Sequence, residues 1–464
     1  MWVLNFILAS IAFANIYVFS PDKLRMDMST RHSHGPIPSS LANFGNPPYG
    51  SIIVGRVFLP RNENQYKGCS PLDHISWDDD PDIVNSPILL LERGGCSFVV
   101  KVRNAQNIGA SAVLIMNNVD GSIDPITMID DGTAGNIDIP SLLITKADGD
   151  LIKDYIKKES FQTRVALSIS FEMPHPDNTV EYDIWMTSGF PIMRKFLYEF
   201  APVAKKFNST NAVFTPHYVI YYCVECKATG FKTDNQDCYG GGKYCSPDPD
   251  EGYGPLTGRD VLDESLRQLC INKANIKNQK VWWDYIRGFY EMCGSDKNFT
   301  KKCSEKAMER VKIDKYSIEE CVASSFSISN WVYSDNSLLD DEKYALADSG
   351  ILFYPAIVIN NQVYRGDFEV SAVMTAICAG YQDKPKICID YFNGLLPGDD
   401  SETSEGVGAG TVVLVMALCL LFLIAVLIAY WVWMRRDMKA DIRRQANSAI
   451  NQYIALTEQN IRNH

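Results

Sequence analysis

One long run without a charged side chain constrains this chain more than any other feature. Residues 407–434 contain no Asp, Glu, Lys or Arg, and 411–434 alone is 24 residues long. A helix rises ~1.5 Å per residue, so this length crosses a hydrocarbon core of about 30 Å. One end of the run carries aromatic residues of the kind that sit at membrane interfaces, namely Tyr430, Trp431 and Trp433. The run predicts a single transmembrane helix over 411–434.

Charges on either side of this helix predict its orientation. Residues 389–410 carry five acids and no Lys or Arg, whereas the tail 435–464 has six basic residues against three acids. The positive-inside rule therefore places the tail in the cytosol and residues 15–410 outside the cell or in a lumen. Residues 1–14 are apolar and end in Ala-Phe-Ala, the form of a signal-peptidase site. We expect 1–14 to be a cleaved signal peptide rather than a signal anchor, and 389–410 to be an acidic stalk.

This topology divides the 13 cysteines and the net charge of −12 unequally. Twelve cysteines precede the predicted helix, and an even number in an oxidising compartment favours six disulfides. The tail carries +3, which leaves −15 for the portion before the membrane. That acidity argues against nucleic acid as a partner, because phosphates need basic groups. Two sequons predict glycosylation of the lumenal portion, at Asn208 and Asn298.

The predicted lumenal portion begins with a β-rich region over residues 40–175. Short strand-like runs alternate with turns at 51–59, 87–91, 112–116 and 165–171. One helix pattern starts near Ser97 and stops near Gly109. The region has no catalytic triad set, no HExxH and no phosphate-binding glycine loop, so we expect it to be non-catalytic and to hold no metal or cofactor.

One motif in this region carries a family resemblance. Leu91-Glu92-Arg93-Gly94-Gly95-Cys96-Ser97-Phe98, followed by Lys101 and Asn104-Ala105-Gln106, resembles the signature of the protease-associated domain. The version most similar to it occurs in the vacuolar sorting receptors of plants, where this loop meets the N-terminal part of the cargo. The resemblance implies a cargo-binding loop and a second loop within 126–131, with candidate residues Arg93, Gly94, Gly95, Cys96, Ser97, Phe98, Thr127, Met128 and Asp130.

The residues of the first loop suit such a role. An arginine offers a fork of donors to peptide carbonyls or carboxylates, and glycines let backbones approach closely. Cys96 is predicted to pair with Cys69, the only other cysteine of the region. Two alternatives stay open. Arg93 could instead form a structural salt bridge, and the acids of 78–82 could bind calcium or a basic cargo, although a solvated loop is favoured there.

Residues 178–388 follow the order of a second fold. Strand, helix and strand patterns at 182–186, 192–207 and 213–223 precede a cysteine-rich helical stretch at 258–325. A hairpin and a closing helix follow, at 356–360, 362–365 and 368–381. This is the order of a thioredoxin-like α/β domain with a helical insertion, and Tyr354-Pro355 resembles the cis-proline of that superfamily. The fold class is therefore multidomain α+β: a β-rich domain, a thioredoxin-like domain and one transmembrane helix.

A Cys-x-x-Cys pair in the second domain raises an enzyme alternative. Cys223 and Cys226 could act as a thiol-disulfide oxidoreductase, since such motifs lower a thiol pKa. In this fold, however, the redox pair lies between the first strand and first helix, and 187–191 contains no cysteine. Structural disulfides are therefore favoured over redox chemistry, and over a zinc site that adds Cys238 and Cys245.

The second domain also resembles the vacuolar sorting receptors. Phe214-Thr215-Pro216-His217-Tyr218, Trp282-Trp283-Asp284-Tyr285 and Pro355-Ala356-Ile357-Val358-Ile359-Asn360 are similar to that family's central region. The resemblance implies that the domain reads cargo further along its sorting peptide. Trp282 and Trp283 could line a groove, but burial is favoured. The plant receptors have cysteine-dense repeats before the membrane, whereas 390–410 has no cysteine. The titration range of His74, His175 and His217 suggests a hypothesis of acid-triggered cargo release.

The predicted cytosolic tail carries a short sorting pattern. Tyr453-Ile454-Ala455-Leu456 has the form of a clathrin-adaptor signal, in which an extended peptide places tyrosine and leucine in separate pockets. The tail has no cysteine and so cannot hold a RING zinc site. The sequence predicts a single-pass type I receptor of the Golgi, endosome and vacuolar pathway that binds soluble lumenal cargo proteins or their sorting peptides and a clathrin adaptor.

Overall fold

The computed structural model describes residues 14–75, 86–123, 126–158, 164–207, 210–223, 236–250, 254–295, 298–349, 351, 353–394 and 430. Several predicted features lie outside these residues: the signal peptide before Ala14, all of the transmembrane run except Tyr430, the tail with its sorting pattern, the acids of 78–82 and the sequon at Asn208. No helix within the described ranges is long and apolar enough to cross a membrane.

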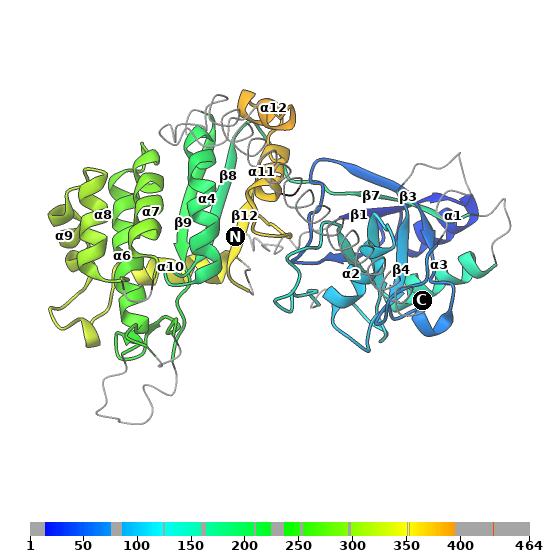
Figure 1. Cartoon of the computed structure of the whole chain (residues 1–464), viewed down its shortest axis with the longest axis horizontal. Helices are drawn as coiled ribbons and strands as arrows, with labels where there is room; N and C mark the ends of the chain where they lie inside the picture. The colour runs from blue at the N-terminus through cyan, green and yellow to red at the C-terminus, as the bar shows by residue number, and fades with distance from the viewer. Residues whose placement is uncertain are drawn as a thin grey trace, which may run out of the picture. The chain divides into compact units, whose positions relative to one another are not determined.

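The first domain is built on a seven-stranded sheet with the strand order β1-β7-β3-β4-β5-β6-β2. Its strands are β1 (Asn15–Ser20), β2 (Ser39–Leu41), β3 (Ile52–Phe58), β4 (Ile88–Glu92), β5 (Ala112–Met116), β6 (Ser141–Ile144) and β7 (Ala166–Ser170). Its helices are α1 (Asp22–Arg31), the short η1 (Glu63–Gln65), α2 (Phe98–Asn107) and α3 (Lys146–Lys157). The central strands β3, β4, β5 and β6 run parallel (Figure 1).

Burial of both sheet faces explains the apolar runs of the central strands. Leu89 and Leu91 of β4 pack with Val99 and Val102 of α2 in one core cluster. Alternate residues of the same strand, including Leu90, belong to a second cluster with α1 and α3. Successive side chains of a strand point to opposite faces, so a strand covered on both sides reads as continuously apolar.

The sheet of the first domain extends beyond the predicted start at residue 40. Strand β1 pairs antiparallel with β7, with Asn15 opposite Ser170 and Ile16 opposite Ile169. Ile16 is fully buried, whereas Tyr17 is exposed. This alternation marks an edge strand with one face in the core. Residues 15–41 are therefore an integral part of the domain.

The second domain has a four-stranded sheet with the order β13-β12-β8-β9, as expected for a thioredoxin-like fold. Its strands are β8 (Val180–Met186), β9 (Ala212–Tyr218), β12 (Ala356–Ile359) and β13 (Gln362–Val363). Helix α4 (Pro191–Phe207) connects β8 to β9, which run parallel. Helices α11 (Val370–Ala379) and α12 (Lys386–Phe392) follow the hairpin. The peptide bond between Tyr354 and Pro355 is cis, as predicted.

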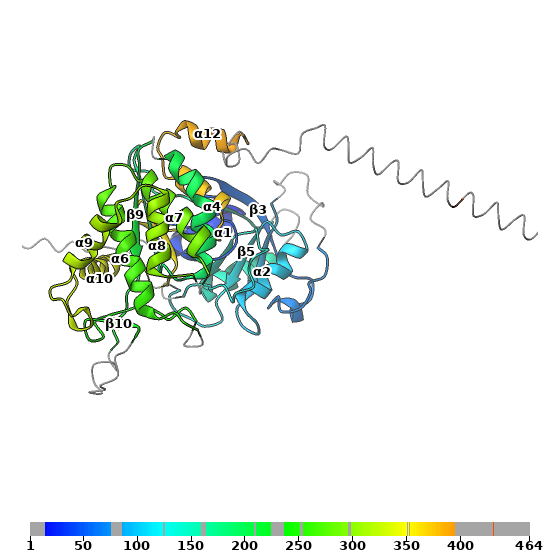
Figure 2. The ribbon, with the colours of Figure 1, turned by 60° about the vertical axis from the view of Figure 1, so that its left-hand side comes forward.

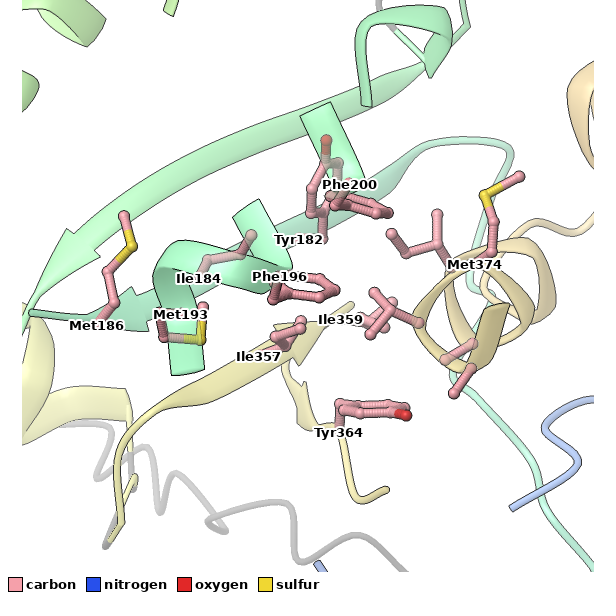
Figure 3. Close-up of a cluster of buried hydrophobic side chains, with 14 of the residues drawn as sticks. Tyr182, Ile184, Met186, Met193, Phe196, Phe200, Ile357, Ile359, Tyr364 and Met374 are labelled. Carbon is pink, nitrogen blue, oxygen red and sulfur yellow. The ribbon is translucent and has the colours of Figure 1, made fainter. Parts of the chain in front are cut away.

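One face of this sheet packs against α4 and α11. Figure 3 shows Tyr182, Ile184 and Met186 of β8 turned toward residues of α4, with side chains of β12 and α11 completing the cluster. The predicted helix face is confirmed, since Phe196, Leu197, Phe200, Ala204 and Phe207 are buried and Val203 packs at the margin. Spacing of three and four residues places these side chains along one stripe of the helix.

A helical insertion separates β9 from β12, as the sequence predicts. It contains α6 (Gly258–Ala274), α7 (Lys280–Cys293), α8 (Lys301–Arg310), α9 (Lys315–Ser325) and α10 (Ser337–Ser349), with the short η2 (Trp331–Tyr333). The small strands β10 (Cys238–Tyr239) and β11 (Tyr244–Cys245) precede it. Helices α4 and α7 lie side by side in both views (Figures 1 and 2). Trp282 and Trp283 of α7 are buried, which confirms the prediction of burial rather than a groove lining.

Disulfides join neighbouring elements of the second domain. Cys270–Cys321 ties α6 to α9, Cys293–Cys303 ties α7 to α8, and Cys378–Cys388 ties α11 to α12. Cys238–Cys245 closes the β10–β11 hairpin, which excludes a zinc site that uses these two cysteines. These four disulfides therefore stabilise the second domain by closing short and medium loops of the chain.

Candidate functional site

The predicted cargo-binding loop, Arg93–Phe98, connects the end of β4 to the start of α2. Gly94 and Gly95 have φ angles of 105° and 86°, a left-handed region that residues with a side chain rarely adopt. A Cβ on Gly95 would lie 3.0 Å from the Cys69 sulfur. Glycine is therefore required where the loop crosses the disulfide. Cys96 is bonded to Cys69, as the sequence predicts.

Arg93 is held at one end and leaves most of its guanidinium uncommitted. Its backbone N–H donates to Met116 O at 2.9 Å, and its Nη1 donates to Asn117 Oδ1 at 2.9 Å. The guanidinium carbon lies 5.8 Å from the centre of the Phe98 ring. No carboxylate pairs with Arg93 within the described ranges, so the salt-bridge alternative finds no support there. A partly exposed arginine with spare N–H donors can bind a carbonyl or carboxylate.

The second candidate loop contacts the first through Asp131. Ser97 Oγ donates to Asp131 Oδ2 at 2.6 Å, and Thr133 donates twice to Asp131 Oδ1, from its N–H at 3.1 Å and its hydroxyl at 2.6 Å. These bonds favour the ionised carboxyl and lower the pKa of Asp131, with the Ser97 bond as the largest cause. Asp131 was absent from the predicted site residues, although it ends the segment that carries the resemblance.

The other candidate residues of the second loop have different surroundings. Asp130 is exposed, and its Oδ1 accepts from the Gly132 and Ala134 amides at 2.8 and 3.1 Å. Thr127 is partly buried, and Met128 is fully buried among core residues. The Met128 side chain therefore packs in the core and holds the second loop to it, while Asp130 and Thr127 lie nearer the surface.

Helix α2 forms hydrogen bonds with two segments of the chain, one before the Arg93–Phe98 loop and one after the second loop. Asn104 Nδ2 donates to Gly68 O at 2.8 Å and to Ser70 O at 3.1 Å. Gln106 Nε2 donates to Asn136 O at 2.7 Å, and its Oε1 accepts from the Asp138 amide at 2.7 Å. Polar residues of the signature thus fix the 67–70 segment and the chain after the second loop to one rigid helix.

The turn between β8 and α4, where a thioredoxin-like enzyme carries its redox cysteines, contains a buried serine and no cysteine. Ser188 follows β8, is fully buried, and its Oγ donates to Val261 O at 2.9 Å. The Ser265 hydroxyl donates to Ser188 Oγ at 3.1 Å. Cys223 is disulfide-bonded, and its predicted motif partner Cys226 lies outside the described residues. The turn after β8 therefore holds no thiol for redox chemistry.

The histidines of the release hypothesis lie in unrelated places. His217 stacks on Trp185 with ring centres 4.1 Å apart, and its Nδ1 lies 3.2 Å from Glu342 Oε2. His175 Nδ1 lies 2.8 Å from Met173 O, and His74 is exposed. None of the contacts described for these three histidines involves the Arg93–Phe98 loop, so their role remains a hypothesis.

Comparison with known proteins agrees with this architecture. A family model described as the vacuolar sorting receptor thioredoxin-like domain matches residues 180–378, and a model of the PA domain matches residues 53–152. Vacuolar-sorting receptor 1 of Pisum sativum is 32% identical over 433 residues, which are 87% of this chain and 65% of that protein. Vacuolar-sorting receptor 4 of Arabidopsis thaliana is 34% identical over 399 residues, 80% of this chain and 60% of that protein.

Other similarities are more local. A receptor homology region, transmembrane domain- and RING domain-containing protein of Arabidopsis thaliana is 42% identical over 132 residues, 28% of this chain and 27% of that protein. DsbA of Mycobacterium tuberculosis is a solved structure with 10% identity and a TM-score of 0.29, which covers 48% of this chain and 94% of that chain. A similarity at that level supports no conclusion.

The described domains define a class of protein in which a protease-associated domain precedes a thioredoxin-like domain, here without a cysteine in the turn after its first strand. The chain carries the vacuolar sorting receptor thioredoxin-like domain after a PA domain, and most of its length is similar in sequence to vacuolar sorting receptors. It spans 60–65% of the length of the two receptors compared above.

Proposed function

We propose that this chain is a type I single-pass sorting receptor that binds soluble cargo proteins in the lumen of the Golgi. It delivers them to a vacuole or lysosome-type organelle and does not catalyse a reaction. The names of its relatives support the receptor class. The observation that carries the proposal is the partly exposed Arg93 at the start of a disulfide-pinned loop, with an amide as its side-chain partner.

The loop offers complementary contacts to an extended peptide. The free N–H groups of Arg93 donate to peptide carbonyls or to a carboxylate. Gly95 is exposed and carries no side chain, so a peptide backbone can lie close to it. Phe98 supplies an apolar surface beside the guanidinium. Thr127 and Asp130 lie on the second loop, which Asp131 joins to the first, and they extend the surface along the cargo.

The alternative, a membrane-tethered thiol-disulfide oxidoreductase, has less support. A thioredoxin-type enzyme needs a reactive thiol after its first strand, and this position holds Ser188 with its hydroxyl bonded to the backbone. Cys223 follows β9 rather than β8, away from the turn where this fold carries its redox cysteines. The proposal therefore assigns the second domain a binding role further along the cargo peptide.

The proposal includes the segments outside the described residues. The apolar run 411–434 anchors the receptor, and the charge difference across it places residues 435–464 in the cytosol. Tyr453–Leu456 then engages a clathrin adaptor. Residues 389–392 belong to α12, so the acidic stalk that separates the folded domains from the membrane begins after this helix rather than at residue 389.

The test uses the full-length protein in membranes, cross-linked to lumenal proteins and recovered for mass spectrometry. Arg93→Ala is compared with Arg61→Ala, a control that removes another exposed arginine of the same domain. We expect wild type and Arg61→Ala to recover the same set of soluble proteins and Arg93→Ala to lose most of it. Equal recovery by all three proteins would refute the proposed binding loop.

A further inference from the structure

Lys101 is a buried lysine that has no contact role in the proposed peptide-binding surface. It lies one turn into α2, and its side chain is fully buried beneath the Arg93–Phe98 loop. Its Nζ donates to Gly94 O at 2.6 Å and to Lys67 O, and lies 3.5 Å from the Cys69 sulfur. An ammonium has three N–H donors, so these three acceptors match its full capacity.

The acceptors come from two separate segments of the chain. Gly94 directly follows Arg93, whereas Lys67 and Cys69 belong to the segment that the disulfide joins to Cys96. The disulfide connects these segments at the sulfur atoms, and the ammonium connects them at their carbonyls. The disulfide and the Lys101 amine together fix the direction of the backbone at Gly94, and therefore the position from which the Arg93 side chain extends.

We propose that Lys101 is a positioning residue of the peptide site: through Gly94 O, Lys67 O and the Cys69 sulfur, its terminal amine sets the loop conformation in which Arg93 presents its N–H donors. This inference rests on the proposed function for its effect on cargo. Its effect on the loop itself is independent of any cargo.

The surroundings of Lys101 give it a measurable signature. The pKa of Lys101 is lowered from 10.5 to about 8, chiefly by burial and also by the nearby Lys67, whereas Glu92 acts in the opposite direction. Glu92 itself pairs with Lys153 of α3 at 2.5 Å. An open loop would return the amine to water and to its ordinary pKa. The closed loop therefore binds the proton more weakly, and its stability against opening rises between pH 8 and 10.5.

Hydrogen exchange of the full-length protein tests the positioning role without cargo. In Lys101→Met the carbonyls of Gly94 and Lys67 lose a charged donor, and we expect exchange of 67–70 and 93–97 at pH 7 to accelerate about tenfold. Lys67→Met is the matched control, because it removes an exposed lysine and keeps the carbonyl that Lys101 binds. Its exchange at pH 7 should equal that of wild type.

The pH profile tests whether the buried amine of Lys101 controls the stability of the loop. After correction for intrinsic exchange, wild-type protection of 93–97 should increase from pH 8 to pH 10 and stay constant from pH 7 to pH 5. Competitive acylation of wild-type lysines should find Lys101 as the amine with the lowered pKa, which needs no variant to fold. Lys101→Met should lack the increase. The inference is wrong if Lys101→Met and wild type share one exchange profile.

Cargo recovery then distinguishes this inference from the proposed function. If Arg93→Ala loses cargo while Lys101→Met changes neither exchange nor recovery, the receptor role stands and the positioning role fails. If Lys101→Met changes exchange but Arg93→Ala recovers cargo normally, the positioning role stands and this loop is not the cargo site. We expect both variants to lose cargo, and Lys67→Met to retain it.

Discussion

The Ser97 hydroxyl donates a 2.6 Å hydrogen bond to the Asp131 carboxylate and accepts one from the Val100 amide at 3.3 Å. One side chain therefore caps α2 and joins two loops that are 34 residues apart. Both loops were assigned to cargo binding by resemblance. Their connection through Ser97 means that movement of one loop is transmitted to the other.

The first prediction concerns this connection. Ser97→Ala removes the cap and the bond to Asp131, so we expect faster hydrogen exchange in 126–134 and a loss of α2 stability of about 1 kcal/mol. Ser97→Thr keeps a hydroxyl that can serve both partners and is the matched control. Unchanged exchange of 126–134 in Ser97→Ala would show that the loops move independently.

The second prediction concerns acidification. The pKa of Asp131 in the folded protein lies below its ordinary value of 3.8. The bond to Ser97 therefore contributes its full stability above pH 3.8, and this stability is lost only as the pH falls from 3.8 through the lower folded pKa. After correction for intrinsic exchange, the protection of 126–134 should therefore be the same at pH 7 and pH 5. A loss of protection between these values would place the acid-sensitive group of this loop elsewhere.

The candidate site illustrates what a sequence can reveal about a binding loop. The motif identified Arg93, the two glycines and the Cys69–Cys96 pair, because each has a requirement that is visible in one dimension. Lys101 and Asp131 act through contacts with distant segments. Lys101 belongs to the protease-associated signature, but only the folded chain shows that its amine donates a hydrogen bond to the Gly94 carbonyl.

The fold shows the same division between local and distant information. The thioredoxin-like order and the buried stripe of α4 were predicted, since apolar spacing and turn residues are local signals. Strand β1 was missed because its apolar residues follow the apolar signal-like segment, and only pairing with β7 reveals it as part of the sheet. Helix α3 was also missed: its polar face obscures the apolar residues that cover the sheet, such as Ile152.

The third prediction concerns the loop disulfide. Cys69–Cys96 closes a separation of 27 residues, for which the chain-entropy estimate is about 3.6 kcal/mol. The Cys69→Ser, Cys96→Ser double variant should lose up to this stability in denaturant unfolding followed by exchange of the first domain. Exchange of α7 and α8 should not change, because Cys293–Cys303 remains.

The fourth prediction separates binding from redox chemistry. The full-length protein should not accelerate insulin reduction by a small thiol, since the turn after β8 contains Ser188 and no cysteine. A bacterial DsbA serves as the positive control. Turnover well above background that Cys223→Ser abolishes would restore the oxidoreductase alternative.

The fifth prediction concerns glycosylation of the Asn298 sequon. Asn298 is exposed, Phe299 is buried, and the Thr300 side chain accepts from the Cys303 amide at 3.3 Å as the cap of α8. A glycan on Asn298 therefore projects outward while its neighbours hold the turn. Asn298→Gln should remove one glycan, seen as a mobility shift equal to that of enzymatic deglycosylation at this site, with no change in the unfolding of α8.

Variants of Thr300 distinguish the two roles of the turn. Thr300→Ala removes both the glycan and the helix cap, so α8 should lose about 1 kcal/mol in addition to the glycan. Thr300→Ser keeps the sequon and a capping hydroxyl, and should resemble wild type in both measurements. The assignment of Asn298 is wrong if Asn298→Gln and wild type migrate identically when expressed through the secretory pathway.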